Sequence, residues 1–440
     1  MALVIIISIY FKESAKLMKQ TKHYLKLLCE KGLIHILSGS FLTKIVGFFG
    51  SIFIVRVLSK QEYGILGYLE NMYSYVFIIA GMGLSNAILR FVILGKDINE
   101  KYSYFQYTVR KGFLWNILLA LMAGTVFLFY PHPETYQGYI WLILVLLLAL
   151  PFQYLTDNTL CNERAMFANQ RYAVLAFILS ASIIVSKIIS GYLGGLYAVV
   201  ICQALVYVVL GIAFLYNTGR KYYINASANT LQRIEKKKIN SYSLQYMITN
   251  GLWAIFMLND TFLLGRFCTP EVIADYRVAY TIPGSISIIS SAIGIYVAPY
   301  FVQHENDRSW IQKNFKRAYG ITAFVVGGLC IAIAVLSKPI IWLLYGETYL
   351  NVIGVMRILL LAAFFNCGLR FTTANILAAM GKVKYNMAVS IIGMAAQLLI
   401  NFQIIPIYGV IGVALTSCIV YGIMAVCLLA VFVKQYYLKE

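Results

Sequence analysis

Long apolar runs alternate with short polar segments along this sequence. The ten residues "VRVLSKQEYG", Val55–Gly64, are charged and turn-like, yet they separate the apolar stretches Leu33–Val55 and Ile65–Val92. Several apolar runs reach the ~20 residues that a helix needs to cross a bilayer. We therefore predict that this polar segment is a tight connection between two membrane helices, lying at the water interface.

The same pattern predicts twelve membrane-spanning helices. Two are less regular than the rest, because Lys44 interrupts the first and the fourth is short. The predicted spans are Leu33–Val57, Ile65–Ile93, Phe113–Tyr130, Tyr139–Leu155, Tyr172–Gly191, Leu196–Tyr216, Tyr246–Phe267, Ala279–Phe301, Ala318–Leu336, Val352–Ala374, Tyr385–Ile405 and Gly409–Val433.

Composition agrees with this pattern. The 440 residues are 61% hydrophobic and only 12% charged, whereas soluble proteins carry about 25% charged residues. The sequence therefore predicts an all-α polytopic membrane protein.

The basic residues predict its orientation. If both termini are cytoplasmic, the cytoplasmic segments hold 28 Lys and Arg residues and the outward loops hold 6, which is a strong positive-inside bias. The six outward residues are Arg56, Lys60, Arg266, Arg277, Lys338 and Arg357. This bias accounts for the net charge of +19 without a nucleic-acid partner.

Two basic clusters flank predicted membrane helices, at Arg220–Lys221 and Arg233–Lys238. Their expected partners are anionic lipid headgroups. The first 31 residues form a further basic amphipathic segment, in which "MALVIIISIY" is too short to span and has the wrong charge order for a signal peptide. We expect either that translation starts at Met18 or that this segment lies on the inner leaflet.

Cysteine and histidine do not suggest a chemical site. The eight cysteines are scattered singly and there are only four histidines. Without Cys-x-x-Cys or Cys/His clusters, the cysteines fit small apolar membrane residues, and we predict neither a disulfide framework nor a metal site.

Weak internal repetition divides the chain into two halves. A shift of about 210 residues places "RVLSKQEYGIL", from Arg56, on "RFCTPEVIADY", from Arg266. Two parallel six-helix repeats place their substrate site between the halves. We predict an N-lobe at 32–216, a basic cytoplasmic linker at 217–241 and a C-lobe at 242–440.

Three motifs near the start of the chain resemble one transporter family. They are Arg56-Val57-Leu58, Glu62-Tyr63-Gly64, and the Gly-x-Gly-Leu-Ser-x-Ala-Ile-x-Arg segment Gly81–Arg90. The segments "GKVKYNM" and "YGVIGVALTS" strengthen the likeness. The sequence is similar, from about Met18 onward, to the polysaccharide exporters, Wzx-type flippases of the multidrug/oligosaccharidyl-lipid/polysaccharide (MOP) superfamily.

This resemblance implies a fold and a function. The fold would be two pseudo-symmetric six-helix lobes around a central cavity. The protein would flip an undecaprenyl-diphosphate-type lipid-linked oligosaccharide across the bacterial inner or plasma membrane by alternating access, for O-antigen, capsule or another surface polysaccharide. Coupling to an H⁺ or Na⁺ gradient and contact with polysaccharide polymerase machinery are further expectations.

Two other functional classes are weighed against a flippase. An ion-coupled multidrug exporter of the same superfamily is the alternative, and it would need acidic residues deep in a lobe to bind cationic drugs. An enzyme is disfavoured because the chain has no Asp-x-Asp pair and no outward loop longer than about twenty residues.

Lys44 is the first candidate substrate-binding residue. Together with Ser40, Gly47 and Ser51 it forms one stripe of small and polar residues on the first predicted helix, and a cation in the membrane usually faces the bundle interior or a water-filled cavity. Lys187, in the fifth span, is the second candidate, and the alternative is that it snorkels outward. Either cation would bind the substrate phosphates.

The remaining candidates lie near the predicted outer face. Arg56 and its counterpart Arg266 either contact substrate or act as interfacial cations, and Arg56 has the further alternative of capping a helix C-terminus. Asp260 either pairs with a cavity cation, takes part in ion coupling or pairs with Arg266. We expect Arg370 to snorkel to the cytoplasmic side.

Overall fold

The computed structural model describes residues 33–438, and these residues form helices without any strand. The predicted segment 1–31 and the alternative start at Met18 lie outside them. The first half contains α3 (Leu33–Val57), α4 (Lys60–Ile78), η1 (Ala80–Gly83), α5 (Leu84–Leu94), α6 (Ile98–Phe129), α7 (Glu134–Gln137), α8 (Ile140–Ala165) and α9 (Asn169–Tyr222).

The second half contains a comparable series of helices. They are α10 (Arg233–Phe267), α11 (Pro270–Ser285), α12 (Ser287–Gln303), α13 (Arg308–Val335), α14 (Ser337–Tyr345), η2 (Glu347–Val352), α15 (Ile353–Ala363), the π-helix η3 (Phe364–Arg370), α16 (Phe371–Ala379), α17 (Val383–Val433) and the π-helix η4 (Lys434–Leu438). The all-α prediction is therefore confirmed for the described residues.

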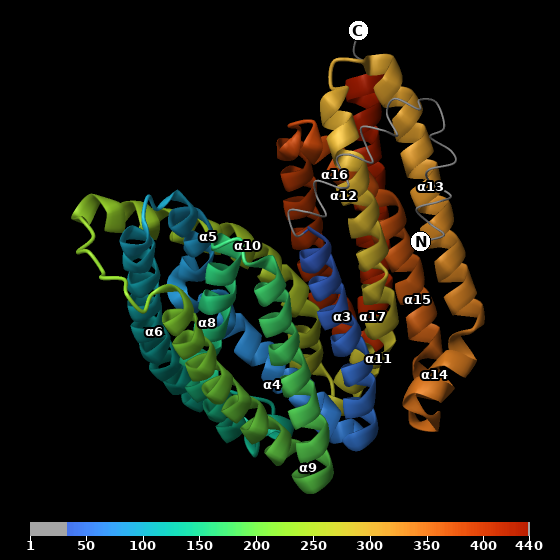
Figure 1. Cartoon of the computed structure of the whole chain (residues 1–440). Coiled ribbons are helices and arrows are strands. Elements are labelled where there is room, and N and C mark those ends of the chain that lie inside the picture. Colours follow the sequence, from blue (N-terminus) through green and yellow to red (C-terminus); the bar gives the residue numbers. More distant parts are fainter. Residues whose placement is uncertain (1–32, 439–440) are drawn as a thin grey trace.

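The chain forms two bundles, which we call the first bundle (α3–α9) and the second bundle (α10–η4). Figure 1 shows them approaching each other at the end where α4 begins and α14 lies, and diverging toward the other end. We call the end where the two bundles approach each other the closed end. The division into lobes at 217–241 stays a prediction, because α10 packs against both α4 and α17.

The predicted count of twelve spans is not confirmed. Six described helices are long and apolar enough to cross a membrane, or up to eight if each of two bent pairs counts as one span. α9 and α17 each contain two of the predicted spans. Glycines with non-helical backbone angles separate the two spans, at Gly194–Gly195 in α9 and at Gly409 in α17. The chain reverses at such positions because glycine tolerates left-handed and extended backbone angles.

The second predicted span is broken rather than continuous. α4 and α5 meet at an angle of 46°, with positive φ at Gly81, Met82 and Gly83. Gly81 also has no room for a side chain, because an added Cβ would lie 2.1 Å from the Tyr154 ring. Its N–H donates to Asn116 Oδ1 at 3.0 Å, so the break is a fixed feature that satisfies the freed backbone.

The eighth and tenth predicted spans are interrupted as well. The eighth is divided into α11 and α12 next to Pro283, which cannot donate an intrahelical hydrogen bond. The tenth is divided by η3 into α15 and α16. The lengths of the apolar runs were sufficient to locate these spans, but they could not reveal the breaks inside them.

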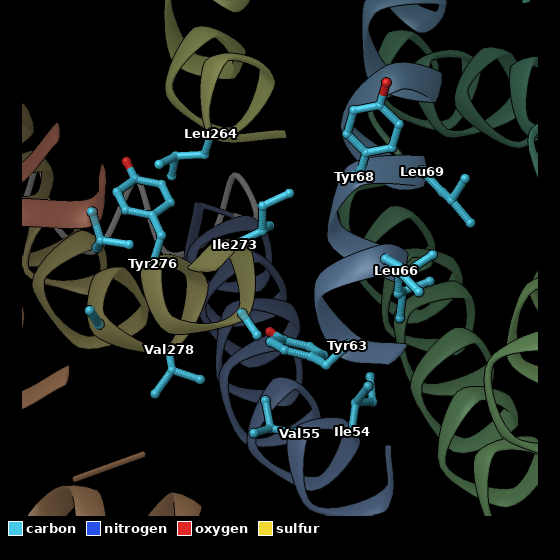
Figure 2. Packing of buried hydrophobic residues seen from close by; sticks show 14 of the residues in the cluster. Ile54, Val55, Tyr63, Leu66, Tyr68, Leu69, Leu264, Ile273, Tyr276 and Val278 are labelled. Carbon is cyan, nitrogen blue, oxygen red and sulfur yellow. The ribbon is translucent and has the colours of Figure 1, made fainter. Parts of the chain in front are cut away.

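The buried apolar core is continuous between the two bundles at the closed end. One cluster of buried residues includes members of α3, α4, α10 and α11. Figure 2 shows Tyr63 of α4 and Ile273 of α11 between these two helices, whereas Leu66 and Leu69 lie on the side of α4 that faces away from α11. The polar segment of the sequence analysis therefore precedes a helix that packs against the other bundle.

Candidate functional site

A cavity of about 460 Å³ lies between the two bundles, within the size range of small-molecule sites. α3 contributes Ser51 and α4 contributes Tyr63, while the other lining residues belong to the second bundle. The polar and aromatic members from that bundle are Phe256, Asp260, Thr261, Tyr276, Arg277, Tyr280, Thr281, Ser287, Asn366, Arg370, Phe371, Gln397, Ser417 and Tyr421.

Three charged side chains meet beside this cavity and form what we call the Glu70 cluster. Glu70 of α4 lies between Lys187 of α9 and Arg277 of α11, with Lys187 Nζ 2.5 Å from Glu70 Oε1 and Arg277 Nη2 2.8 Å from Glu70 Oε2. The Arg277 guanidinium lies 4.6 Å from the centre of the Tyr63 ring. The cluster therefore joins the first bundle to the second.

The charges of the Glu70 cluster do not balance. One carboxylate faces two cations, and Arg277 lines the cavity. In a low-dielectric surrounding an uncompensated cation attracts anions far more strongly than in water. The site is therefore suited to a negatively charged ligand.

The sequence analysis predicted only part of the Glu70 cluster. Lys187 is buried and paired with Glu70, so the alternative that it snorkels outward is wrong. Arg277 was assigned to an outward loop, but it belongs to α11 and faces the cavity. Glu70 was missed, although a lone carboxylate inside a long apolar run is itself a signal for a buried cationic partner.

Another carboxylate beside the cavity, Asp260 of α10, is buried and has neutral donors. Tyr276 Oη donates to it at 2.9 Å, Asn401 Nδ2 at 2.7 Å and Gln397 Nε2 at 3.1 Å. We call these four residues the Asp260 cluster. The expected pairing with Arg266 is not observed, because Arg266 Nη1 donates instead to the carbonyl of Pro131 at 3.3 Å.

The Asp260 cluster contains two further buried acceptors. Gln397 Oε1 and Asn401 Oδ1 have no hydrogen-bond partner among the described residues. Buried acceptors are seldom left unsatisfied. The Asp260 carboxylate, which has no cationic partner among the described residues, can bind a proton or a small cation, and these two oxygens are further acceptors on the same residues.

Arg56 and Arg266 hold the closed end together rather than line the cavity. Arg56 Nε donates to the carbonyl of Leu344 at 2.8 Å, and its Nη2 donates to that of Leu343. These carbonyls belong to the last turn of α14, where a cation is favourable. The helix-capping alternative for Arg56 is therefore observed, and Arg266 forms the corresponding contact from the second bundle to the first.

The seam between α4 and α11 completes the closed end. Lys60 Nζ lies 2.7 Å from Asp275 Oδ1. Gly64 faces the carbonyl of Pro270 so closely that an added Cβ would lie 1.8 Å from it. Lys60 was assigned to an outward loop, but here it is the first residue of α4 and pairs with the second bundle.

Lys44 lies outside the residues that line the cavity. Its side chain is exposed on α3, and Gly47 on the same face has open space around it. Ser51, seven residues later, does line the cavity. The predicted stripe therefore leads into the cavity, and the role of Lys44 in substrate binding stays a prediction.

Arg370 is buried, whereas the sequence analysis expected it to snorkel to the cytoplasmic side. It is 6% exposed, lines the cavity and donates to Asn366 Oδ1 at 2.8 Å and to Ser390 Oγ at 3.2 Å. The π-helix that ends at Arg370 widens the helix by one residue per turn, a device frequent at functional sites. The cavity therefore has arginines from both α11 and η3.

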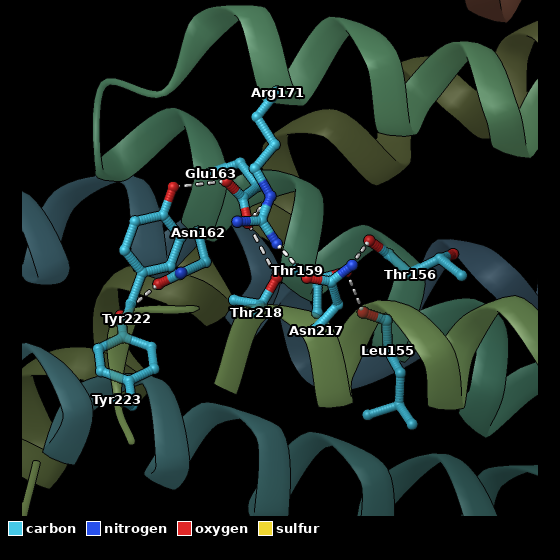
Figure 3. Close-up of polar contacts among 10 residues, drawn as sticks. All are labelled: Leu155, Thr156, Thr159, Asn162, Glu163, Arg171, Asn217, Thr218, Tyr222 and Tyr223. Atoms are coloured by element: carbon cyan, nitrogen blue, oxygen red, sulfur yellow. Dashed lines mark hydrogen bonds and ion pairs between the residues drawn. The ribbon is translucent and has the colours of Figure 1, made fainter. Parts of the chain in front are cut away.

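A buried polar cluster also stands at the far end of the first bundle. α8 extends beyond the predicted fourth span, and Glu163 near its end is fully buried. Figure 3 shows Tyr222 and Thr218 of α9 donating to Glu163, both at 2.8 Å, and Arg171 lies 3.4 Å from it. This cluster ties both ends of α9 to α8, away from the cavity.

Comparisons with known proteins identify a family and several relatives. Residues 53–354 match the model of a family described as Polysaccharide biosynthesis protein. The chain is 24% identical over 423 residues to an uncharacterised membrane protein of Methanocaldococcus jannaschii, MJ1068, covering 90% of this chain and 82% of the relative. It is 22% identical over 344 residues to an uncharacterised membrane protein in the cps region of Klebsiella pneumoniae, covering 72% of this chain and 64% of the relative.

Solved structures show the same fold. The lipid II flippase MurJ in an inward closed conformation superposes with a TM-score of 0.70 at 18% identity, covering 91% of this chain and 87% of that one. An inward-facing multidrug resistance MATE transporter of the MOP superfamily superposes with a TM-score of 0.68 at 15% identity, covering 90% and 94%.

These matches confirm the predicted family resemblance and the MOP-type fold, and the named relatives are membrane proteins. Since the family model covers more than half of the sequence, the chain belongs to the polysaccharide biosynthesis protein family.

Proposed function

We propose that this protein flips a lipid-linked oligosaccharide of the undecaprenyl-diphosphate type from the cytoplasmic to the outer leaflet by alternating access. The observation that carries the proposal is the Glu70 cluster, in which two cations face one carboxylate beside an interbundle cavity. The family match and the relative from a capsule region support a role in surface polysaccharide synthesis.

The chemistry of such a substrate explains why a polar cavity is needed. Each sugar hydroxyl stripped of water costs on the order of 1–3 kcal/mol, and a diphosphate costs far more. Arg277 and Lys187 would bind the phosphates. Tyrosines and amides in the cavity, such as Tyr280 and Asn366, would contact the sugars, while the lipid tail stays in the bilayer.

The proposed orientation has both termini in the cytoplasm of a bacterial cell and the closed end facing outward. Figure 1 places the chain between α9 and α10 at the end opposite to α14. In a variant lacking the eight native cysteines, a cysteine at Asn229 should resist an impermeant thiol reagent in intact cells and one at Thr135 should react. The opposite labelling pattern would contradict this orientation.

The Asp260 cluster is the proposed site of coupling to an H⁺ or Na⁺ gradient. Asp260, Gln397 and Asn401 would hold Na⁺ through oxygen ligands, or Asp260 would carry a proton. Either change alters the charge next to the cavity, because Asp260 and Gln397 both line it. Coupling through this site would link ion binding to the position of α10 relative to α17.

Complementation tests the proposed function. The gene should restore surface polysaccharide to a cell lacking its own flippase, when that cell's glycosyltransferases make the matching lipid-linked oligosaccharide. Arg277→Met and Lys187→Met should each lower the polysaccharide more than tenfold at equal amounts of membrane protein. Full restoration by both variants would reject the proposed phosphate site.

Multidrug export is the second candidate function, and one specific observation favours it. Asp260 presents a buried carboxylate to the cavity, which suits a cationic drug. In cells lacking their own exporters, this function predicts resistance to ethidium that Asp260→Asn abolishes. Under the flippase proposal, expression should leave ethidium sensitivity unchanged.

A further inference from the structure

The charged side chains of the Glu70 cluster differ in their access to the cavity. Arg277 lines it, whereas neither Glu70 nor Lys187 does. Arg277 Nη2 donates to Glu70, and its Nη1 lies against α4, where an added Cβ on Gly67 would lie 2.8 Å away. Tyr63 covers the guanidinium from α4 as well. An anion in the cavity therefore meets an arginine whose Nη2 is already bound to Glu70, while its Nη1 has no hydrogen-bond partner among the described residues.

We propose that Glu70 is a built-in competitor for the substrate's phosphates, which holds Lys187 and Arg277 until a phosphate group takes its place. This inference rests on the proposed function. Glu70 would then be a positioning residue that does not contact the substrate. Glu70 would set the affinity of the protein for the substrate's phosphates and would allow the substrate to be released.

The exchange follows from the charges of the two acceptors. A carboxylate offers two oxygens and one negative charge, and it is covalently held on α4. A diphosphate offers more oxygens and more negative charge, so it can engage both cations at once. When the substrate leaves, Glu70 recovers its partners, and no buried cation is left uncompensated.

The exchange would also act on the closed end. Glu70–Arg277 and Lys60–Asp275 are two ion pairs that join α4 to α11. A phosphate that displaces Glu70 from Arg277 removes one of these pairs while leaving the other intact. Substrate binding would therefore weaken the closed end only when the cavity is loaded, as alternating access requires.

The test measures binding of undecaprenyl diphosphate to the purified full chain in nanodiscs, with undecaprenol as the uncharged probe. We expect Glu70→Gln to bind undecaprenyl diphosphate about tenfold more tightly than the unmodified protein, with undecaprenol unchanged. Its export activity in cells should fall at the same time, because release becomes slow. A residue that merely orients the cations would lower both affinity and export.

Two further variants separate competition from other effects. Glu70→Gln with Lys187→Met keeps the net charge of the cluster, and it should still bind at least as tightly as the unmodified protein because Arg277 is free. Asp275→Asn removes the carboxylate of the other interbundle pair, and its affinity should stay within twofold. If Glu70→Gln does not fold, Glu70→Asp, with a shorter reach, should show an intermediate gain.

The outcomes distinguish this inference from the proposed function. Equal or weaker binding by both Glu70 variants, with clear binding by the unmodified protein, would overturn the competitor role. An equal gain in Asp275→Asn would also overturn it, because loosening of the closed end would then explain the change. If no form of the protein binds undecaprenyl diphosphate, the proposed function itself fails.

Discussion

Two carboxylates beside the cavity, the partly buried Glu70 and the buried Asp260, belong to opposite bundles and have opposite surroundings. Glu70 faces two cations at 2.5 and 2.8 Å. Asp260 accepts hydrogen bonds from a tyrosine and two amides. One part of the cavity is thus left with excess positive charge and another with a carboxylate that no cation neutralises among the described residues.

The two carboxylates therefore suit different ligands. A cationic excess suits phosphate groups, and a carboxylate whose only partners are neutral donors suits a proton or a small cation. Since both sites adjoin one cavity, occupancy of one changes the electrostatic free energy of the other.

The largest expected effect comes from reversing a charge in the Glu70 cluster. Arg277→Glu would place two carboxylates together beside the cavity, and we expect more than about a 100-fold loss of export, since like charges at such range cost several kcal/mol. Arg277→Lys should retain a substantial fraction. The measurement is surface polysaccharide per amount of membrane protein. Near-normal export by Arg277→Glu would contradict the claim that the Glu70 cluster binds the substrate's phosphates.

Neutralising Asp260 should act on coupling rather than on substrate binding. We expect Asp260→Asn to lower gradient-driven transport about tenfold while leaving undecaprenyl diphosphate affinity within twofold. Transport would be measured in proteoliposomes with and without an imposed H⁺ or Na⁺ gradient. A large loss of substrate affinity in this variant would show that the two carboxylates do not have separate tasks.

A larger side chain between α4 and α11 tests whether export requires the closed end to form. Gly64→Ala places a methyl group against the Pro270 carbonyl, which costs about 1–3 kcal/mol in a packed contact. We expect export to fall about fivefold and a spin-label distance between Thr135 and Thr348 to lengthen. Gly47→Ala is the matched control, because Gly47 has open space around it.

The Glu163 cluster should affect stability alone. Glu163→Gln removes a charge that accepts from Thr218 and Tyr222, and each charged hydrogen bond contributes about 1.5–3 kcal/mol. The thermal midpoint in detergent should fall by several degrees, while export per folded molecule should be unchanged. A selective loss of export would place this cluster in the transport cycle.

The smallest expected effect is at Lys44. Its exposed position outside the cavity lining favours long-range attraction of the anionic substrate, so Lys44→Ala should lower export only about two- to threefold. Lys44→Arg should restore it, and Lys44→Glu should be the most harmful of the three. A complete loss in Lys44→Ala would favour the direct phosphate contact predicted from the sequence.

The sequence was sufficient to predict the family, the helical class and the short connection between two helices near Arg56. It did not reveal the break at Gly81–Gly83, because the need for positive φ there arises from packing against Tyr154 and Asn116. Arg277 was overlooked because its partner Glu70 lies 207 residues away. Sequence position alone cannot report such a pair.

The Asp260 cluster shows a similar limit. Asp260 was a candidate, but its partners Gln397 and Asn401 are neutral residues within a long apolar helix. Such amides usually join helices together. Only the fold shows that both amides donate to one carboxylate. These neutral donors distinguish the surroundings of Asp260 from those of Glu70.

Flipping by the purified protein tests the central claim most directly. The protein would be reconstituted into vesicles with a fluorescent oligosaccharide linked to undecaprenyl diphosphate, and the label exposed on the outer leaflet would be quenched by dithionite over time. We predict that the unmodified protein makes nearly all of the label accessible, whereas Arg277→Met leaves about half protected, as in protein-free vesicles. Equal protection with and without the unmodified protein would contradict the account.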